Sequence, residues 1–316
     1  MREHVAALLR RRSVRVGVQL AFAVVVVGSL AYAVRGTWDE ALPRLGDADP
    51  VDLAGALALL AAYYFLFVVG WQWILAALGV SIGYGIALQA EMASMLAKYV
   101  PGGVWTPLAR IVWLRRAGST ARTAVVLSSI LLEAGLSAVS GVLVFVVSLA
   151  LVDVVDAPVV PLLGFALAVA VLLHPRVFVS LAERTFRRFG AEAPPRLSYR
   201  TVIGLLVYYG LTWLVGGAAL YLLLRSLDAD PGLVSVPYLG GTAAVGAIVA
   251  VLSIVAPSGL GVREASMYGL MIVLVPAGAA LGATVLNRLA ITAVEALLLG
   301  GGALGSRVAP GRRTRG

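Results

Sequence analysis

Long apolar stretches alternate with short polar segments along almost the whole chain. An α-helix needs roughly 20 apolar residues to cross the hydrocarbon core of a bilayer. Six stretches approach or exceed that length, and they are residues 16–34, 53–78, 123–151, 159–173, 201–224 and 277–304. The pattern therefore predicts an all-α polytopic membrane protein with about six spanning helices.

Apolar length and charge indicate what the segments around the first and fourth predicted spans form. Ala31-Tyr32-Ala33 imitates a signal-peptide cleavage site, but the 19 apolar residues of 16–34 suffice to span, so we expect a retained helix. Residues 35–52 are predicted to form an acidic loop. Residues 176–200 are predicted to form a short amphipathic segment on the inner leaflet.

Two further apolar stretches, residues 86–118 and 235–275, are interrupted near their middle. The residues at the interruptions are Pro101, Gly102 and Gly103 in the first stretch, and Pro257, Gly259 and Gly261 in the second. Pro lacks a backbone N–H and clashes with the preceding turn, and Gly disfavours a helix, so neither stretch forms one continuous helix. In a membrane protein this pattern favours a re-entrant hairpin whose freed backbone groups line a polar cavity.

Charge is distributed asymmetrically between the polar segments. Those rich in Arg are 1–15, 115–122, 176–200 and 307–315, and those rich in Asp are 35–52, 153–156 and 228–230. If both interrupted stretches are re-entrant, every basic segment falls on the side of the N-terminus and every acidic one on the other. The positive-inside rule then predicts a multi-pass protein of the cell (plasma) membrane with cytoplasmic N- and C-termini.

The same assignment divides a single transmembrane domain, residues 1–316, into two halves of opposite topology. One repeat covers about 16–152 with hairpin 86–118, and the other about 158–305 with hairpin 235–275. The polar residues Ser129, Glu133, Ser137 and Ser140 have the same spacing as Thr284, Arg288, Thr292 and Glu295. Inverted-topology repeats with broken helices are typical of transporters.

Composition agrees with this class and excludes several chemistries. The chain is 60% hydrophobic and 13% charged, with mean hydropathy +0.95, as in integral membrane proteins. It has no Cys and only two His, so we expect no metal site, no cofactor and no cysteine or histidine catalysis. No nucleotide-binding loop or nucleophile motif is present, and we expect no enzyme. The net charge of +9 comes from Arg flanking apolar stretches, which favours anionic lipid headgroups over nucleic acid.

Eight charged residues lie inside the predicted membrane segments, namely Lys98, Arg110, Arg263, Arg288, Glu91, Glu133, Glu264 and Glu295. Each costs about 2.5–3.5 kcal/mol near the bilayer centre unless it is paired or hydrated. One interpretation is that they form structural ion pairs between the hairpins and the third and sixth spans. The other is that the cations bind an anionic headgroup, with Glu133 and Glu264 as orienting partners or proton carriers. Backbone N–H groups of 104–106 and 261–263 would also point into the cavity.

The residues around the interruptions resemble a known family. KYVPGGVW at 98–105 with Arg110 and Glu133, and PSGLGVRE at 257–264 with Arg288, resemble the flippase-like transmembrane domain of lysylphosphatidylglycerol synthases. The resemblance covers nearly the whole chain and implies a protein that moves lipids between leaflets. It does not extend to the soluble aminoacyltransferase domain, so it does not imply lipid synthesis.

Three functional hypotheses follow. The first is a flippase-like transporter of a lipid with an anionic phospho- or polyprenyl-phosphate-type headgroup, working downhill or coupled to an ion such as a proton at Glu133 or Glu264. The second is a transporter of a small anion. The third is a non-catalytic membrane partner of a glycosyltransferase or lipid-modifying enzyme. For transport, the predicted substrate-binding residues are Lys98, Arg110, Arg263, Arg288, Glu133 and Glu264.

Overall fold

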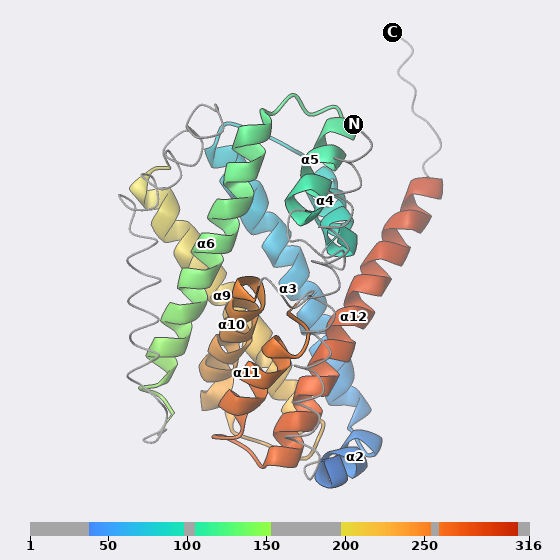
Figure 1. Ribbon diagram of the computed structural model, residues 1–316, viewed down its shortest axis with the longest axis vertical. Coiled ribbons are helices and arrows are strands. Elements are labelled where there is room, and N and C mark those ends of the chain that lie inside the picture. Colours follow the sequence, from blue (N-terminus) through green and yellow to red (C-terminus); the bar gives the residue numbers. More distant parts are fainter. Residues whose placement is uncertain (1–37, 98–104, 153–196, 254–258, 309–316) are drawn as a thin grey trace, which may run out of the picture.

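The computed structural model describes residues 38–97, 105–152, 197–253 and 259–308, and within these ranges it is helical with no strand (Figure 1). The elements are α2 (Trp38–Gly46), α3 (Pro50–Ala77), α4 (Tyr84–Ala97), α5 (Trp105–Arg116), α6 (Thr123–Ser148), α9 (Tyr199–Arg225), the 3₁₀ turn η2 (Leu233–Ser235), α10 (Val236–Leu252), α11 (Val262–Met271) and α12 (Ala277–Val308). The all-α prediction is confirmed for this part of the chain.

Five segments of the described chain are long and apolar enough to cross a membrane. They are α3, α6, α9, Leu233–Leu252 and the Ala277–Leu299 part of α12. Four of them match predicted spans to within a few residues. The fifth, Leu233–Leu252, lies in the second predicted hairpin. The predicted spans at 16–34 and 159–173, and most of the amphipathic segment at 176–200, fall outside the described residues.

Side-chain caps fix where the long helices begin. The Asp49 carboxylate accepts the N–H groups of Val51 and Asp52, at 2.8 and 2.9 Å, and Pro50 occupies the first turn of α3. The Ser198 hydroxyl accepts the N–H of Thr201 at 3.2 Å at the start of α9. Both caps satisfy N–H groups that a helix leaves without a partner.

The prediction of a loop over residues 35–52 is wrong, because Trp38–Gly46 forms α2. Acidic residues occupy its first turn and Arg44 its last, which suits the helix dipole. Its apolar side packs on α12, and Ala41 is fully buried. Pro43, inside the helix, and the surrounding acidic residues are common in turns, which favoured the loop interpretation.

The shorter helices lie at opposite ends of the molecule. Figure 1 shows α4 and α5 in the upper half and α10 and α11 in the lower half, while α3, α6 and α12 run from one end to the other. α4 packs on α5, and α10 packs on α11. The predicted interruption of the second stretch is present as Gly259 and Gly261, both with positive φ (65° and 84°), before α11 begins. Positive φ favours Gly because it has no Cβ.

Glycines let α10 lie unusually close to α9. A Cβ added to Gly217 of α9 would lie 2.3 Å from the Val236 carbonyl oxygen, and one added to Gly240 of α10 would lie 2.6 Å from the Trp213 carbonyl oxygen. Most of the residues of α10 from Tyr238 to Gly246 are buried. The lower end of the molecule is therefore closely packed around α10.

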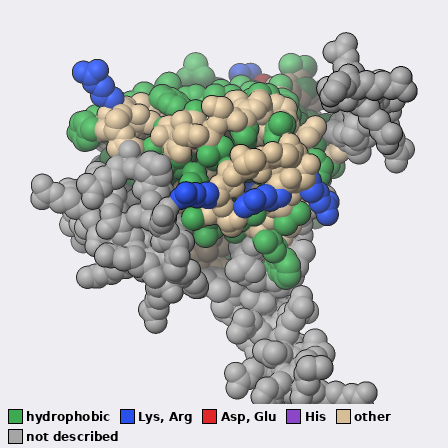
Figure 2. Space-filling view, turned by 90° about the horizontal axis from the view of Figure 1, so that it is seen from above, with side chains coloured by type: hydrophobic (Ala, Val, Ile, Leu, Met, Phe, Trp, Pro, Cys, Tyr) green, Lys and Arg blue, Asp and Glu red, His purple; other side chains and the backbone are tan. Residues whose placement is uncertain are grey.

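The two ends carry opposite charge. Figure 2 shows Arg side chains on the upper face, where α5 ends and α6 and α9 begin (Figure 1). Among the described residues, the exposed Arg residues of this end are Arg115, Arg116, Arg122 and Arg200. At the opposite end the exposed acidic residues are Asp39, Glu40, Asp47, Asp49, Asp228 and Asp230.

Candidate functional site

Three charged residues within the described ranges form the Arg110 cluster, which consists of Arg110, Glu91 and Glu133. Arg110 Nη1 of α5 donates to Glu133 Oε2 of α6 at 2.5 Å, and its Nη2 forms an ion pair with the Glu91 carboxylate of α4. Arg110 and Glu133 are each only 5% exposed. One guanidinium therefore holds three helices together.

An aromatic residue covers the guanidinium of this cluster. Trp71 of α3 is fully buried, and Arg110 lies 4.6 Å from its ring centroid. The indole Nε1 of Trp71 donates to Ser129 Oγ at 2.9 Å, which fixes the ring. A cation over an aromatic face is stabilised electrostatically.

The Arg110 cluster is incompletely paired. Within the described residues, Glu133 Oε1 and Arg110 Nε are buried with no hydrogen-bond partner, and so is the nearby Tyr209 hydroxyl. Buried polar atoms normally find a partner, and leaving one without costs about 1–3 kcal/mol. Since the cluster has two carboxylates and one cation, its negative and positive groups are also unequal in number.

A second pair links α11 to α12. Arg288 Nη1 donates to Glu264 Oε1 at 3.3 Å, with the two side chains 25% and 18% exposed. Glu264 Oε2 accepts the Gly261 N–H at 2.7 Å and so caps α11. The Gly261 N–H, predicted to point toward a ligand, is therefore bonded to Glu264.

Arg263 differs from the other two Arg residues. It lies at the start of α11, partly buried, and among the described residues no carboxylate forms an ion pair with it. Its side chain passes Gly246, where an added Cβ would lie 3.3 Å from Arg263 Cγ. Tyr63 and Tyr64 of α3 are within its electrostatic range. Within the described residues, the Arg263 guanidinium therefore lies near tyrosines and has no carboxylate partner.

Tyrosines of α3 lie between the charged groups. Tyr64 donates its hydroxyl to Glu295 of α12, while Tyr63 is close enough to interact electrostatically with both Arg263 and Glu133. The ring of Tyr63 packs on Phe67 and Trp213, with centroids 4.9 and 5.6 Å apart. The contact of Tyr63 with Trp213 joins α3 to α9 and holds the Tyr63 ring within range of both Arg263 and Glu133.

The two polar stripes predicted from spacing have different surroundings. On α6, Ser129, Glu133, Ser137 and Ser140 are all buried. Ser140 Oγ donates to Leu206 O at 2.9 Å, and Trp213 Nε1 donates to Ser137 O at 2.8 Å, so this stripe bonds α6 to α9. On α12, Thr284 and Thr292 bond carbonyls of their own helix, and Thr292 is exposed.

The predicted site residues are thus separated into groups. Arg110 and Glu133 lie together, Glu264 and Arg288 lie together, and Arg263 has no carboxylate partner among the described residues. Lys98, Pro101, Gly102, Gly103 and Pro257 lie outside the described residues. Tyr63, Tyr64 and Trp71 are additional neighbours of the charges, and their ring N–H and O–H groups inside a predicted span were the available signal.

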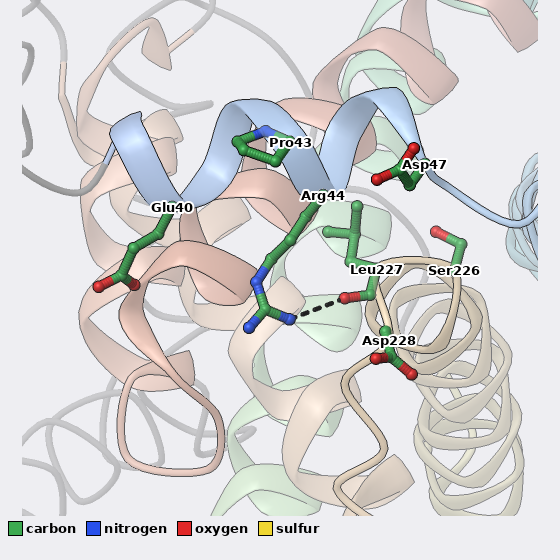
Figure 3. Close-up of a pocket in the computed structure, with 7 residues that line it drawn as sticks. All are labelled: Glu40, Pro43, Arg44, Asp47, Ser226, Leu227 and Asp228. Carbon is green, nitrogen blue, oxygen red and sulfur yellow. Dashed lines mark hydrogen bonds between the residues drawn. The ribbon is translucent and has the colours of Figure 1, made fainter.

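A cavity of about 380 Å³ lies at the acidic end (Figure 3). Its lining residues are Glu40, Pro43, Arg44, Asp47, Ser226, Leu227 and Asp228. Arg44 reaches from α2 to the Leu227 carbonyl oxygen at 3.0 Å, and so binds α2 to the chain after α9. No group of three or more His, Asp or Glu within the described ranges could hold a metal ion.

A comparison with protein-family models matches residues 18–299 to the lysylphosphatidylglycerol synthase transmembrane region. The chain belongs to this family. The matched range contains the Arg110 cluster, the Arg288–Glu264 pair and Arg263. Membership in the lysylphosphatidylglycerol synthase transmembrane family indicates a multi-pass membrane protein related to lipid handling. A comparison with curated proteins found no match.

Proposed function

We propose that this protein is a flippase-like transporter that moves a lipid with an anionic phospho- or polyprenyl-phosphate-type headgroup between the leaflets of the cell membrane. Arg263 is the observation that carries the proposal. Arg110 and Arg288 have carboxylate partners, whereas Arg263 has none among the described residues. An uncompensated charge in a membrane segment costs about 2.5–3.5 kcal/mol, and an anionic headgroup would remove that cost.

The surroundings of Arg263 suit a phosphate. Its guanidinium can donate two parallel hydrogen bonds to phosphate oxygens. Arg263 is in the first turn of α11, where the helix dipole favours negative charge. Tyr63 and Tyr64 stand on the α3 side. The Tyr64 hydroxyl donates to Glu295, and the Tyr63 hydroxyl offers a further donor. Lys98 and Arg288 complete the proposed cationic set, with Glu264 orienting Arg288.

The arrangement of the short helices suggests how access changes. We place α4–α5 and α10–α11 as re-entrant hairpins from opposite leaflets, one in each of two inverted repeats. Their positions in opposite halves of the molecule support this placement (Figure 1). The headgroup would enter between the hairpins while the acyl chains stay in the bilayer, and movement of one repeat against the other would expose it to either side.

We propose that the protein transports lipid and catalyses no reaction. The Arg-rich end would face the cytoplasm together with both termini. A glycosyltransferase or lipid-modifying enzyme would then supply or consume the transported lipid. A purely structural role for every charge, as in a non-transporting partner of such an enzyme, leaves Arg263 without an explanation.

The test is translocation of a labelled anionic phospholipid in liposomes containing the purified protein. Arg263→Gln is expected to fold and to lower the rate about 10- to 100-fold, because a hydrogen bond to a charged group contributes about 1.5–3 kcal/mol. The matched control is Arg225→Gln, since Arg225 is exposed at the acidic end and 3.5 Å from Asp52. Undiminished transport in Arg263→Gln would contradict the site. A small anion that moves while lipid does not would favour the small-anion transporter.

A further inference from the structure

The Arg110 cluster has an excess of negative groups. Glu91 and Glu133 share one guanidinium, so the fully ionised cluster would carry a charge of −1 in a buried site. The Arg288–Glu264 pair, by contrast, is balanced one to one. A buried carboxylate without a compensating charge holds a proton rather than remaining ionised. The excess therefore marks the Arg110 cluster, not the Arg288 pair, as the place for an exchangeable proton.

One oxygen in the cluster is available for that proton. Glu133 Oε2 accepts from Arg110, whereas Glu133 Oε1 is buried without any hydrogen-bond partner in the described part of the chain. Glu133 itself is 5% exposed. Its second oxygen therefore lacks the hydration or hydrogen bonds that would stabilise a negative charge.

The helices packed around Glu133 supply no second cation in the described ranges. α5 contributes Arg110 and α4 contributes Glu91. Tyr209 of α9 and Tyr63 of α3 are the further titratable groups within range, and both are neutral at physiological pH. The one titratable residue of α10, Tyr238, donates its hydroxyl to the Leu270 carbonyl oxygen at 3.0 Å. Within the described residues, the two carboxylates therefore share only the charge of Arg110.

We infer that the Glu91–Arg110–Glu133 cluster binds one exchangeable proton at Glu133 Oε1 and is the coupling site of the transporter, an inference that rests on the proposed lipid transport. Binding forms an O–H bond at Oε1 with a proton taken from water, and release returns the proton to water. With the proton the cluster is neutral, and without it the cluster is −1. Glu91 is the more accessible carboxylate, 15% exposed against 7% for Glu133 by side chain, so exchange runs past Glu91.

Proton release would act on the attachment of the α4–α5 hairpin. Arg110 ties α4 and α5 to α6 through Glu91 and Glu133, whereas α10 is fixed by close backbone contacts with α9. Gain or loss of the proton on Glu133 therefore changes the ionic contacts of Arg110, and with them the attachment of the α4–α5 hairpin to α6. The position of α10 is not affected. A metal ion would need several converging ligands, and none of the described residues form such a group.

Infrared spectroscopy of the purified protein tests the proton directly. At neutral pH, solvent-exposed carboxyl groups are ionised, so a protonated carboxyl band reports a buried acid. We expect this band in the wild type and its loss in alkaline buffer. We also expect its loss at neutral pH in both Glu133→Gln and Glu91→Gln, since each variant leaves one carboxylate for one guanidinium.

Glu264→Gln is the matched control and keeps the band. If Glu133→Gln does not fold, Glu91→Gln gives the answer. A band that is missing in the wild type, unchanged in both variants, or displaced by Na⁺ would overturn the inference.

Liposomes with a pH difference across the membrane separate this inference from the proposed function. One proton per lipid predicts that the leaflet distribution of the labelled lipid shifts by up to about tenfold per pH unit. In Glu91→Gln the distribution should be the same with and without the pH difference. Lipid translocation in the wild type that ignores the pH difference would refute the coupling and leave the flippase standing. The infrared band without any lipid translocation would refute the flippase and leave the proton site.

Discussion

At the scale of single residues, three Arg side chains within one membrane domain have three different surroundings. Arg110 has two carboxylate neighbours, Arg288 has one, and Arg263 has none among the described residues. A guanidinium is always charged, so its surroundings determine what it can do. Two carboxylates make Arg110 a structural link with an excess of acid. Arg263 has no carboxylate partner within the described residues, and for that reason we propose it as the ligand of an anion.

This difference predicts that substitutions of Arg110 and Arg263 affect the free energy of unfolding differently. Arg110→Gln leaves two buried carboxylates without their cation and should lower the free energy of unfolding by about 3–5 kcal/mol. Arg263→Gln removes an uncompensated charge and should leave stability unchanged or raised. Unfolding of the purified variants in detergent, followed by circular dichroism, measures both. Equal destabilisation by the two substitutions would show that Arg263 also has an ionic partner.

The sequence identified the charged residues but could not assign their partners. Arg110 and Glu133 are 23 residues apart, and Arg288 and Glu264 are 24 apart, and residues on different helices meet only through the packing of those helices. The cost of charge in a bilayer was enough to predict that these residues face one another or a polar cavity. It could not predict that Glu91 joins Glu133 on Arg110, or that Tyr64 donates to Glu295, because both depend on how α4 and α3 are rotated about their axes.

At the scale of helices, apolar length predicted the long elements well, while ends and short helices depended on local chemistry. The predicted span 201–224 is α9, Tyr199–Arg225, and its N-terminus is set by the Ser198 cap. α2 was missed because its length is far below that of a span. Trp38, Ala41, Leu42 and Leu45 follow helical spacing, which is the signal that could have revealed it.

The contact between α9 and α10 provides a prediction at this scale. Gly217→Ala would place a methyl group 2.3 Å from the Val236 carbonyl oxygen and 2.5 Å from the Gly240 backbone nitrogen. Since both atoms are backbone, the helices must separate, and overpacking of this kind costs about 1–3 kcal/mol. Thermal unfolding in detergent measures the loss.

The matched control for that substitution is on the same helix. At Gly210 an added Cβ would lie 3.7 Å from Val144 Cγ2, an ordinary contact. Gly210→Ala should therefore be neutral or stabilising by up to about 1 kcal/mol, as expected for Ala over Gly in a helix. If both variants are equally stable, α9 and α10 lie farther apart than the structure shows.

At the scale of the whole molecule, the asymmetry of charge links the fold to the membrane. The sequence predicted one basic and one acidic side, and the described residues carry exposed Arg at one end and exposed acids at the other (Figures 1 and 2). Neither hydropathy nor length decides whether Leu233–Leu252 crosses the bilayer or returns, because 20 apolar residues are consistent with both. That choice determines the sidedness of every segment after it.

Sidedness can be measured with single cysteines, because the natural chain has none. Arg116→Cys, Arg200→Cys, Asp47→Cys and Asp228→Cys each place one thiol at an exposed position. With the α4–α5 hairpin re-entrant, a membrane-impermeant thiol reagent applied to intact cells should label the two Asp positions and spare the two Arg positions. Inverted membrane vesicles should give the reverse. If the α4–α5 hairpin instead crossed the membrane once, Arg116 would lie on the side opposite to that predicted. Because two predicted spans, 123–151 and 159–173, separate residues 116 and 200, such a crossing would move both Arg positions to the side of Asp47. Labelling of Arg116→Cys and Arg200→Cys from the same side as Asp47→Cys would therefore contradict the inverted repeat, and with it the alternating access that we propose for lipid transport.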